Sequence, residues 1–126
     1  MGKPVQASKA RRRVAEHMGR QAEDEVAELF CRQGYEVLAR RLKTSAGEID
    51  LVVATARVLV FVEVKARSNF ADAAQALLPR QQARLLRAAD IALALHASWA
   101  RPDTRFDVAL VAQGEISLIE NAIWVG

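Results

Sequence analysis

The segment from residue 47 to residue 67, GEIDLVVATARVLVFVEVKAR, constrains the fold more than any other part of the sequence. Most of its residues are Val, Leu, Ile, Phe and Ala, which are typical of buried strands. The segment nevertheless carries charged residues at Glu48, Asp50, Glu63 and Lys65. An ionised group that leaves water is costly unless it is paired, hydrogen-bonded or bound to a metal. We therefore expect the fold to compensate these charges together, at a functional site.

The sequence predicts one mixed α/β domain over residues 1–126, with its elements in the order α-β-β-β-α-β-β. A chain of this length, with 52% hydrophobic residues, is suited to a single core. The short connection at residues 55–57 indicates an antiparallel hairpin. We expect a mixed central sheet flanked by helices. The expected elements are a helix at 8–33, strands at about 36–43, 48–54 and 58–66, a loop at 67–77, a helix at 79–98, and strands at 105–112 and from 115.

The register of the predicted hairpin decides whether the charged residues meet. Side chains alternate between faces along a strand, so Glu63 and Lys65 share a face with Phe61, and Glu48 shares a face with Asp50. If Asp50 lies opposite Glu63 or Phe61, the two carboxylates are within about 8 Å of each other. A slip of one residue would place them on opposite faces of the sheet. We predict the first register, because it gathers the costly charges in one place.

Two carboxylates at this separation are suited to a shared hard divalent cation such as Mg²⁺, which also keeps water ligands and binds substrate phosphate. A nearby lysine on the same face can stabilise developing charge or orient the attacking water. The cluster thus contains the components of metal-assisted phosphodiester hydrolysis. The alternative is a structural ion pair of Lys65 with Glu63 or Asp50, which predicts no metal affinity.

Two sequence motifs in this segment are GEIDL and FVEVKAR. Before them in the chain stand GRQAED and GYEVLARR, and after them stands RFDV. Together they resemble the YraN family of uncharacterised bacterial proteins, from residue 19 to about residue 107. That family is similar to the Holliday-junction-resolvase branch of the PD-(D/E)XK nuclease superfamily. The resemblance implies a restriction-endonuclease-like core for this chain.

The resemblance also implies roles for individual residues. Asp50 and Glu63 match the acids that bind Mg²⁺ or Mn²⁺ in the superfamily, and Lys65 matches the catalytic lysine of its E-x-K element. Glu23, on the first helix, matches a glutamate that completes the catalytic site in related resolvases. Glu48 belongs to the same signature as a supporting residue. Its role is open between metal binding, a pair with Lys65, and shaping the strand.

The chain departs from the family pattern at three places. Arg41-Leu42-Lys43 stands where the family often has Asn-aromatic-Arg. Gln81 occupies the position of a lysine in relatives, so this supporting residue keeps hydrogen bonding without the positive charge. The loop at 67–79 is shorter than usual and lacks the expected glycine. These differences concern the fit of a substrate more than the binding of metal.

The positive charge of the chain is unevenly distributed. The net charge is +3 and the isoelectric point about 9.5, and residues 1–20 hold six basic residues against one acid. This basic arm, at about residues 1–12, suits a polyanion such as nucleic acid, although a solvated and frayed terminus is the alternative. The predicted nucleic-acid-binding residues are Arg67, beside Lys65, and a stripe at spacing i, i+4, i+7 on the second helix, Arg80, Arg84 and Arg87.

We therefore predict a metal-dependent endonuclease that cleaves DNA, with branched or damaged DNA as candidate substrates. The alternative is a nucleic-acid-binding accessory protein that keeps the nuclease fold without its chemistry. The sequence leaves open DNA or RNA, and one metal or two. Related resolvases act as dimers, so a homodimer is a further expectation. No apolar run approaches the roughly 20 residues of a membrane span, and Cys31 is the single cysteine. We expect a cytoplasmic protein without a membrane partner.

Overall fold

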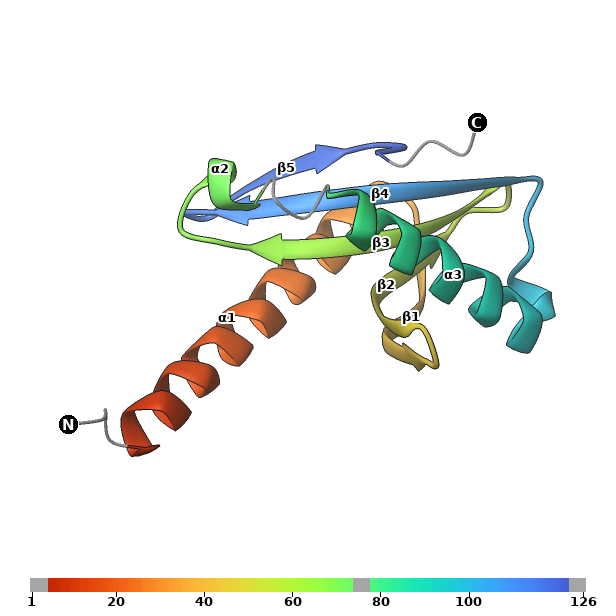
Figure 1. Cartoon of the computed structure of the whole chain (residues 1–126). Coiled ribbons are helices and arrows are strands. Elements are labelled where there is room, and N and C mark those ends of the chain that lie inside the picture. Colours follow the sequence, from red (N-terminus) through yellow and green to blue (C-terminus); the bar gives the residue numbers. More distant parts are fainter. Residues whose placement is uncertain (1–4, 74–77, 123–126) are drawn as a thin grey trace.

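The computed structural model describes residues 5–73 and 78–122, which form a mixed α/β domain around one five-stranded sheet (Figure 1). The strand order is β1-β2-β3-β4-β5; β3 and β4 are parallel, and the other neighbours are antiparallel. This arrangement confirms the predicted mixed sheet flanked by helices. The elements are α1 (Val5–Arg32), β1 (Glu36–Thr44), β2 (Gly47–Ala54), β3 (Val58–Ala66), α2 (Phe70–Ala73), α3 (Pro79–Leu95), η2 (Ala97–Trp99), β4 (Asp103–Ala112) and β5 (Glu115–Ile119).

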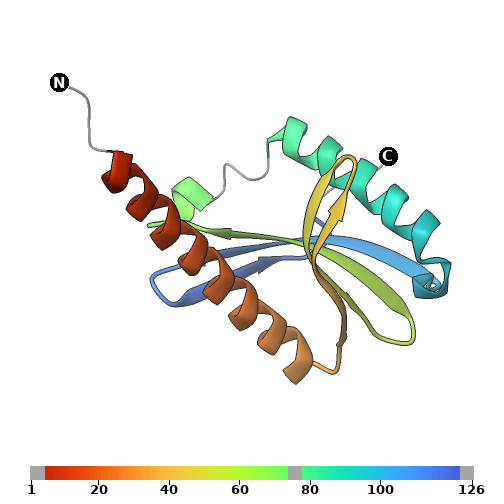
Figure 2. The ribbon, with the colours of Figure 1, turned by 90° about the horizontal axis from the view of Figure 1, so that it is seen from below.

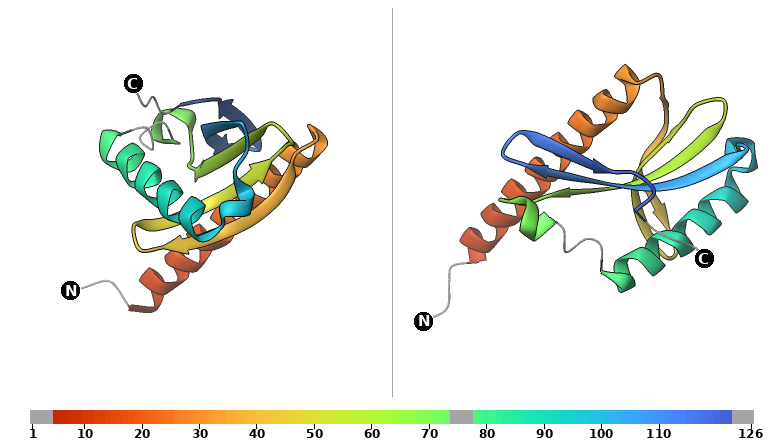
Figure 3. Two further views of the ribbon diagram at one scale, coloured as in Figure 1. Left: turned by 90° about the vertical axis from the view of Figure 1, so that its right-hand side faces the viewer. Right: turned by 90° about the horizontal axis from the view of Figure 1, so that it is seen from above.

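The two long helices cover opposite faces of the sheet (Figures 2 and 3). On one face, α1 buries Val26 and Phe30 against a hydrophobic cluster that includes Val60 and Val62. On the other face, α3 packs against Leu59 and Phe61. Consecutive residues of β3 thus point to different helices, as the alternation of side chains along a strand requires. Because both faces are covered, β2 and β3 are almost continuously apolar.

Local sequence signals determine where α1 ends and where α3 begins. Gly34 has a φ of 91°, and the N–H of Tyr35 donates to the carbonyl of Phe30. This geometry closes α1, because glycine adopts the left-handed conformation without steric cost. Pro79 lies in the first turn of α3, where its missing N–H leaves no helical hydrogen bond unmade. The backbone of Leu78 before it is extended, as expected for a residue that precedes proline.

Three boundaries differ from the sequence-based expectation. Helix α1 begins at Val5, so residues 5–12 of the expected arm are helical, and residues 1–4 lie outside the described residues. The expected loop at 67–77 contains the single turn α2, with residues 74–77 outside the described part. Helix α3 ends at Leu95 rather than near residue 98. The backbone of His96 leaves the helical region there, and its ring stacks on Trp99 at 4.0 Å.

An ion pair within β4 links this strand to the residues that follow α1 and β5. Asp107 is 0% exposed and accepts hydrogen bonds from Nε and Nη2 of Arg105, each at 2.9 Å. Arg105 also donates to the hydroxyl of Tyr35, and the N–H of Asn121 donates to Asp107. The bond to Asp107 raises the pKa of Arg105 above its ordinary value, although burial opposes this. These partners compensate the charge of Asp107 fully within the fold.

The length and apolarity of a helix determine whether it can span a membrane. Within the described ranges 5–73 and 78–122, no helix is both long and apolar enough to cross a membrane.

Candidate active site

The hairpin register brings the two predicted metal ligands together. Leu51 pairs with Val62, and Val52 pairs with Phe61. The same register, continued by one residue, sets Asp50 opposite Glu63, as predicted. The paired strands separate at this point, and Oδ2 of Asp50 accepts a hydrogen bond from the N–H of Val64 at 2.8 Å. A side chain therefore takes the place of the next backbone bond in the ladder.

The environment of Asp50 disfavours the ionised form of its carboxyl group. Burial raises its pKa, and the charge of Glu63 raises it further, to about 7. The N–H of Val64 lowers the pKa, Glu23 raises it slightly, and Lys65 lowers it. The raising contributions dominate, so the ionised carboxylate is undercompensated in the folded protein. A bound cation would relieve this deficit.

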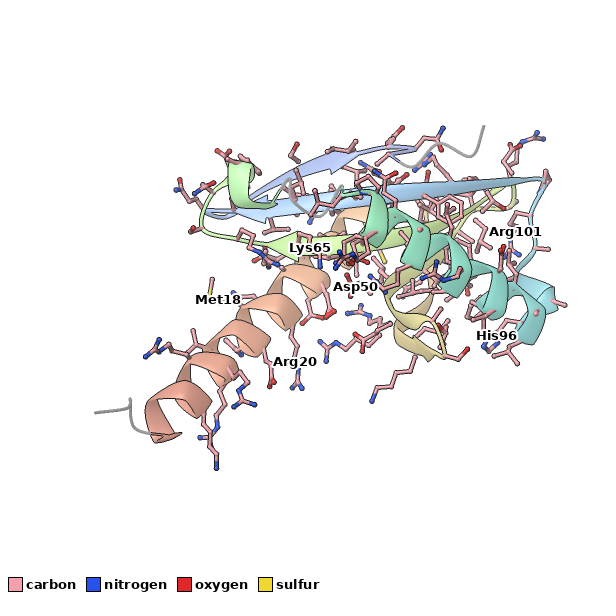
Figure 4. All side chains as sticks on the ribbon, viewed as in Figure 1. Met18, Arg20, Asp50, Lys65, His96 and Arg101 are labelled. Carbon is pink, nitrogen blue, oxygen red and sulfur yellow. The ribbon has the colours of Figure 1, made fainter. Side chains whose placement is uncertain are left out.

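Glu63 is buried and has cations on both of its oxygens. Lys65 Nζ lies 3.1 Å from Oε1, and Arg84 Nη2 lies 3.2 Å from Oε1 and 3.3 Å from Oε2. The side chain of Glu63 is 6% exposed, so these contacts are shielded from water. The ion pair that the alternative hypothesis expected is thus present, and so is the pair of carboxylates. Figure 4 shows Lys65 and Asp50 close together between α1 and α3.

Arg84 is part of this site rather than of an exposed stripe. Its Nη1 donates to the carbonyl oxygen of Glu48 at 3.0 Å, and its Nε donates to Oε1 of Gln81 at 3.2 Å. Arg80 and Arg87 are exposed on the same helix. The helical spacing of the three arginines holds, but Arg84 turns toward the sheet because the buried carboxylate of Glu63 attracts it. Gln81 and Glu48 have supporting contacts through this arginine.

Glu23 approaches the site from α1 and is held by Arg41. Nε of Arg41 lies 2.9 Å from Oε1 of Glu23, whose side chain is 12% exposed. Arg41 has a φ of 49°, in the left-handed region that non-glycine residues adopt rarely. Sequence reasoning missed Arg41 as a site residue, because neither its spacing nor its composition signals this backbone conformation.

A groove of about 320 Å³ lies over Asp50. Four residues of α1 line one side of it, and Arg41, Glu48 and Val64 contribute from the strands. Sequence reasoning also missed Arg20 of this group, although its position three residues before Glu23 places it on the same part of the helix. In Figure 4, Arg20 lies on the side of α1 toward Asp50, and Met18 lies on the other side. The α1 residues are Glu16, Gly19, Arg20 and Glu23.

Arg67 lies apart from this groove. It is exposed, and its Nη1 donates to the carbonyl of Ala66. It lines a second groove, of about 210 Å³, together with Met18 and the turn between β4 and β5. Three predicted residues line the groove over Asp50: Glu23, Glu48 and Asp50 itself. Four others join them through the contacts of Glu63 and Arg84: Glu63, Lys65, Arg84 and Gln81. Arg67, Arg80 and Arg87 remain at the surface.

The donor set fits a hard divalent cation whose coordination is completed by other molecules. Within residues 5–73 and 78–122, no group of three or more His, Cys, Asp or Glu side chains is arranged to hold a metal ion. The two opposed carboxylates, Asp50 and Glu63, remain as donors. Mg²⁺ typically takes one or two protein carboxylates and keeps water and substrate phosphate as its other ligands. The oxygen donors are therefore suited to Mg²⁺ or Mn²⁺ and unsuited to a structural zinc site.

The fold and the site define a class of protein: an α/β domain with a restriction-endonuclease-like core and a carboxylate pair at the edge where two central strands separate. Comparison with known sequences is more specific. The chain belongs to the uncharacterised protein family UPF0102, whose model matches residues 22–111. This membership confirms the family resemblance seen in the sequence.

Relatives of the chain come from several bacteria. A UPF0102 protein from Acidiphilium cryptum is 51% identical over 113 residues, covering 90% of this chain and 88% of the relative. One from Rhodopseudomonas palustris is 48% identical, with 85% and 82% coverage. One from Parvibaculum lavamentivorans is 54% identical, with 78% and 74% coverage. The similarity therefore extends over most of the length of each protein.

Proposed function

We propose that this protein is a Mg²⁺- or Mn²⁺-dependent endonuclease that hydrolyses phosphodiester bonds in DNA. The observation that carries the proposal is the register that pairs Leu51 with Val62, because its continuation brings Asp50 and Glu63 together; Lys65 Nζ lies 3.1 Å from Glu63. A purely structural ion pair needs one acid and one base, and it does not require a second, partly buried carboxylate beside it. The raised pKa of Asp50 is the expected cost of keeping that second acid.

In this proposal, each residue has a separate role. Asp50 and Glu63 hold the divalent cation, which supplies Lewis acidity and an activated water when bound. Lys65 neutralises charge that develops on the phosphate oxygens. Arg41 holds Glu23 at the border of the groove, where Glu23 orients groups near Asp50.

The amino-terminal half of α1 supports nucleic acid as the substrate. It projects beyond the sheet (Figures 1 and 2). Lys9, Arg13 and Arg20 are exposed, and their spacing of four and seven residues places them on one side of the helix. Arg20 lines the groove over Asp50. We name these three residues the α1 ridge, and we propose that it binds the phosphate backbone that leads to the site.

The direct test is cleavage of a labelled DNA pool that contains single strands, duplexes, flaps and four-way junctions, with Mn²⁺ and then Mg²⁺. We expect the wild-type protein to cut at least one substrate. Asp50→Asn removes a ligand charge and Lys65→Ala removes the catalytic cation, so each should reduce the rate at least about 100-fold. Cutting that persists in both variants would refute this assignment of roles.

A second function, that of a non-catalytic nucleic-acid-binding accessory protein, is favoured by one observation. Glu63 already has two cationic partners, Lys65 and Arg84, so its charge is compensated without metal. Binding of the DNA pool without cleavage under any metal condition would support this second function. An RNA pool tested in parallel distinguishes the two nucleic acids.

Two further expectations belong to the same proposal. Cleavage of a junction on two strands calls for two active sites, and hence for a homodimer. Sedimentation with and without a four-way junction measures the oligomeric state directly.

We also propose that the protein acts in the cytoplasm, where bacterial DNA is found. Fractionation of cells that express a tagged protein is the corresponding measurement.

A further inference from the structure

The guanidinium of Arg84 is anchored at three of its nitrogens. Nη2 contacts both oxygens of Glu63, Nη1 donates to the carbonyl of Glu48, and Nε donates to Gln81. The aliphatic part of the side chain passes over Gly47. A Cβ at Gly47 would lie 2.7 Å from Nη1 of Arg84 and 3.2 Å from its Cδ. Gly47, the first residue of β2, therefore leaves room for the arginine in this conformation, and any larger residue would require the side chain of Arg84 to shift.

The positive charges of the site are distributed unequally between its two acids. Glu63 has both Lys65 and Arg84 within 3.2 Å of Oε1, and Arg84 also contacts Oε2. Asp50 accepts a backbone hydrogen bond, and no Lys or Arg of the described residues forms an ion pair with it. A divalent cation shared by the two acids needs a lone pair on Glu63, at oxygens that Arg84 already contacts. These oxygens already have three cationic contacts, and the charges of the metal and the guanidinium repel each other there, so the two compete for Glu63.

We infer that Arg84 is a positioning residue that holds Glu63 in the metal-free protein and yields its contact with the carboxylate when the divalent cation binds. Its bonds to Glu48 and Gln81 do not involve Glu63, so they keep the guanidinium at the site after this exchange. The freed Nη2 would then be available to a phosphate oxygen, which is a fitting partner for a guanidinium. This inference rests on the proposed function, because it requires that the site bind a divalent cation.

The experiment compares Arg84→Met, which keeps the aliphatic length, with Arg84→Lys, which keeps the charge. Arg87→Met is the matched control, since Arg87 is exposed one turn further along the same helix. Two quantities are measured without nucleic acid: the melting temperature in EDTA and the affinity for Mn²⁺ by titration calorimetry. Because neither needs turnover, the result does not depend on finding the substrate.

We expect Arg84→Met to change the two quantities in opposite directions. Its melting temperature in EDTA should fall by several degrees, because buried Glu63 loses a partner. Its affinity for Mn²⁺ should rise about three- to tenfold, because a competing positive charge is gone. Arg84→Lys should bring the Mn²⁺ affinity back to within about twofold of the wild type. Arg87→Met should leave both quantities unchanged.

Two results would overturn the inference, and they are distinguishable. If the wild-type protein binds Mn²⁺ but Arg84→Met binds it equally or more weakly, the exchange is wrong while the proposed function stands. If the wild-type protein and Asp50→Asn both fail to bind Mn²⁺, the proposed metal site and the exchange fail together.

Discussion

At the scale of single residues, Asp50 and Glu63 illustrate two ways of keeping a carboxylate in a protein interior. Glu63 has two cations against its oxygens. Asp50 has a backbone N–H, and its pKa is raised to about 7 by burial and by Glu63. Asp107, in β4, belongs with Glu63, since Arg105 contacts both of its oxygens. Asp50, which is partly buried, is the only one of these three acids without an ion pair, and this difference marks the site.

Asp50→Asn should stabilise the metal-free protein at high pH. The folded-state pKa of Asp50, about 7, exceeds the ordinary value of 3.8 for an aspartate, so its ionisation favours the unfolded state. Wild-type stability should therefore fall as pH rises between these two values, and the variant should escape this loss. In EDTA we expect the variant to be more stable by about 1–3 kcal/mol near pH 8, with no gain near pH 4. Chemical denaturation at both pH values measures the difference, and an equal effect at both would contradict the prediction.

Gly47→Ala should destabilise the fold by about 1–3 kcal/mol, because the residue has a φ of 131° and its new Cβ would meet Arg84. Gly19→Ala is the matched control, since a Cβ added at Gly19 would meet nothing within 4 Å. Within α1 this control should instead gain about 0.5–1 kcal/mol. Thermal unfolding of the two variants in parallel measures both changes in stability. A Gly47→Ala variant as stable as the wild type would show that Arg84 can accommodate a Cβ at residue 47.

At the scale of elements, the strands and their register could be predicted from the sequence because the signals are local. Alternating side chains, apolar runs and a short connection define β2 and β3. The register could be predicted because only one choice places the charged residues on the same face of the sheet. The orientation of Arg84 could not be predicted, because helical spacing alone does not say which arginine of a stripe faces the sheet. The contact of Arg41 with Glu23 depends on a left-handed backbone residue in β1, which only the folded chain specifies.

Asp107→Ala should show that Asp107 has a structural role that differs from the role of Asp50 and Glu63. It should lower the stability of the fold and leave the affinity for Mn²⁺ unchanged. The change leaves the partly exposed Arg105 and the N–H of Asn121 without their shared acceptor, which should cost about 1–3 kcal/mol. Chemical denaturation should detect this loss. Calorimetry below the melting temperature should find the Mn²⁺ affinity of the folded variant within about twofold of the wild type, since Asp107 lies outside the groove over Asp50. A large change in that affinity would place Asp107 among the functional residues.

At the scale of the whole molecule, the site lies between elements that belong to different faces. Helix α1 contributes Glu23, α3 contributes Arg84, and the sheet between them contributes the two acids. The α1 ridge extends this arrangement beyond the sheet (Figure 1). A ligand that follows the ridge would thus reach the groove over Asp50 from the α1 side.

Neutralising the ridge with Arg13→Gln and Arg20→Gln together should weaken DNA binding uniformly across sequences. Two lost phosphate contacts should reduce the slope of log affinity against log salt by about 2. The matched control is Arg32→Gln, at the other end of α1, where Arg32 pairs with Glu28 at the surface. Binding titrations at several salt concentrations measure both slopes; equal slopes in all three proteins would remove the ridge from the interface.

The parallel pairing of β3 with β4 has a consequence for how the chain folds. Strands β1, β2 and β3 are joined by short turns, whereas β4 reaches β3 only after α3 has been placed. Contacts between neighbours in sequence form before contacts that close long loops. We therefore expect the hairpin to bring Asp50 and Glu63 together before Arg84 arrives with α3. Repulsion between the two acids should slow this early step at high pH, and protonation should speed it, so the folding rate should depend on the ionisation of Asp50 and Glu63.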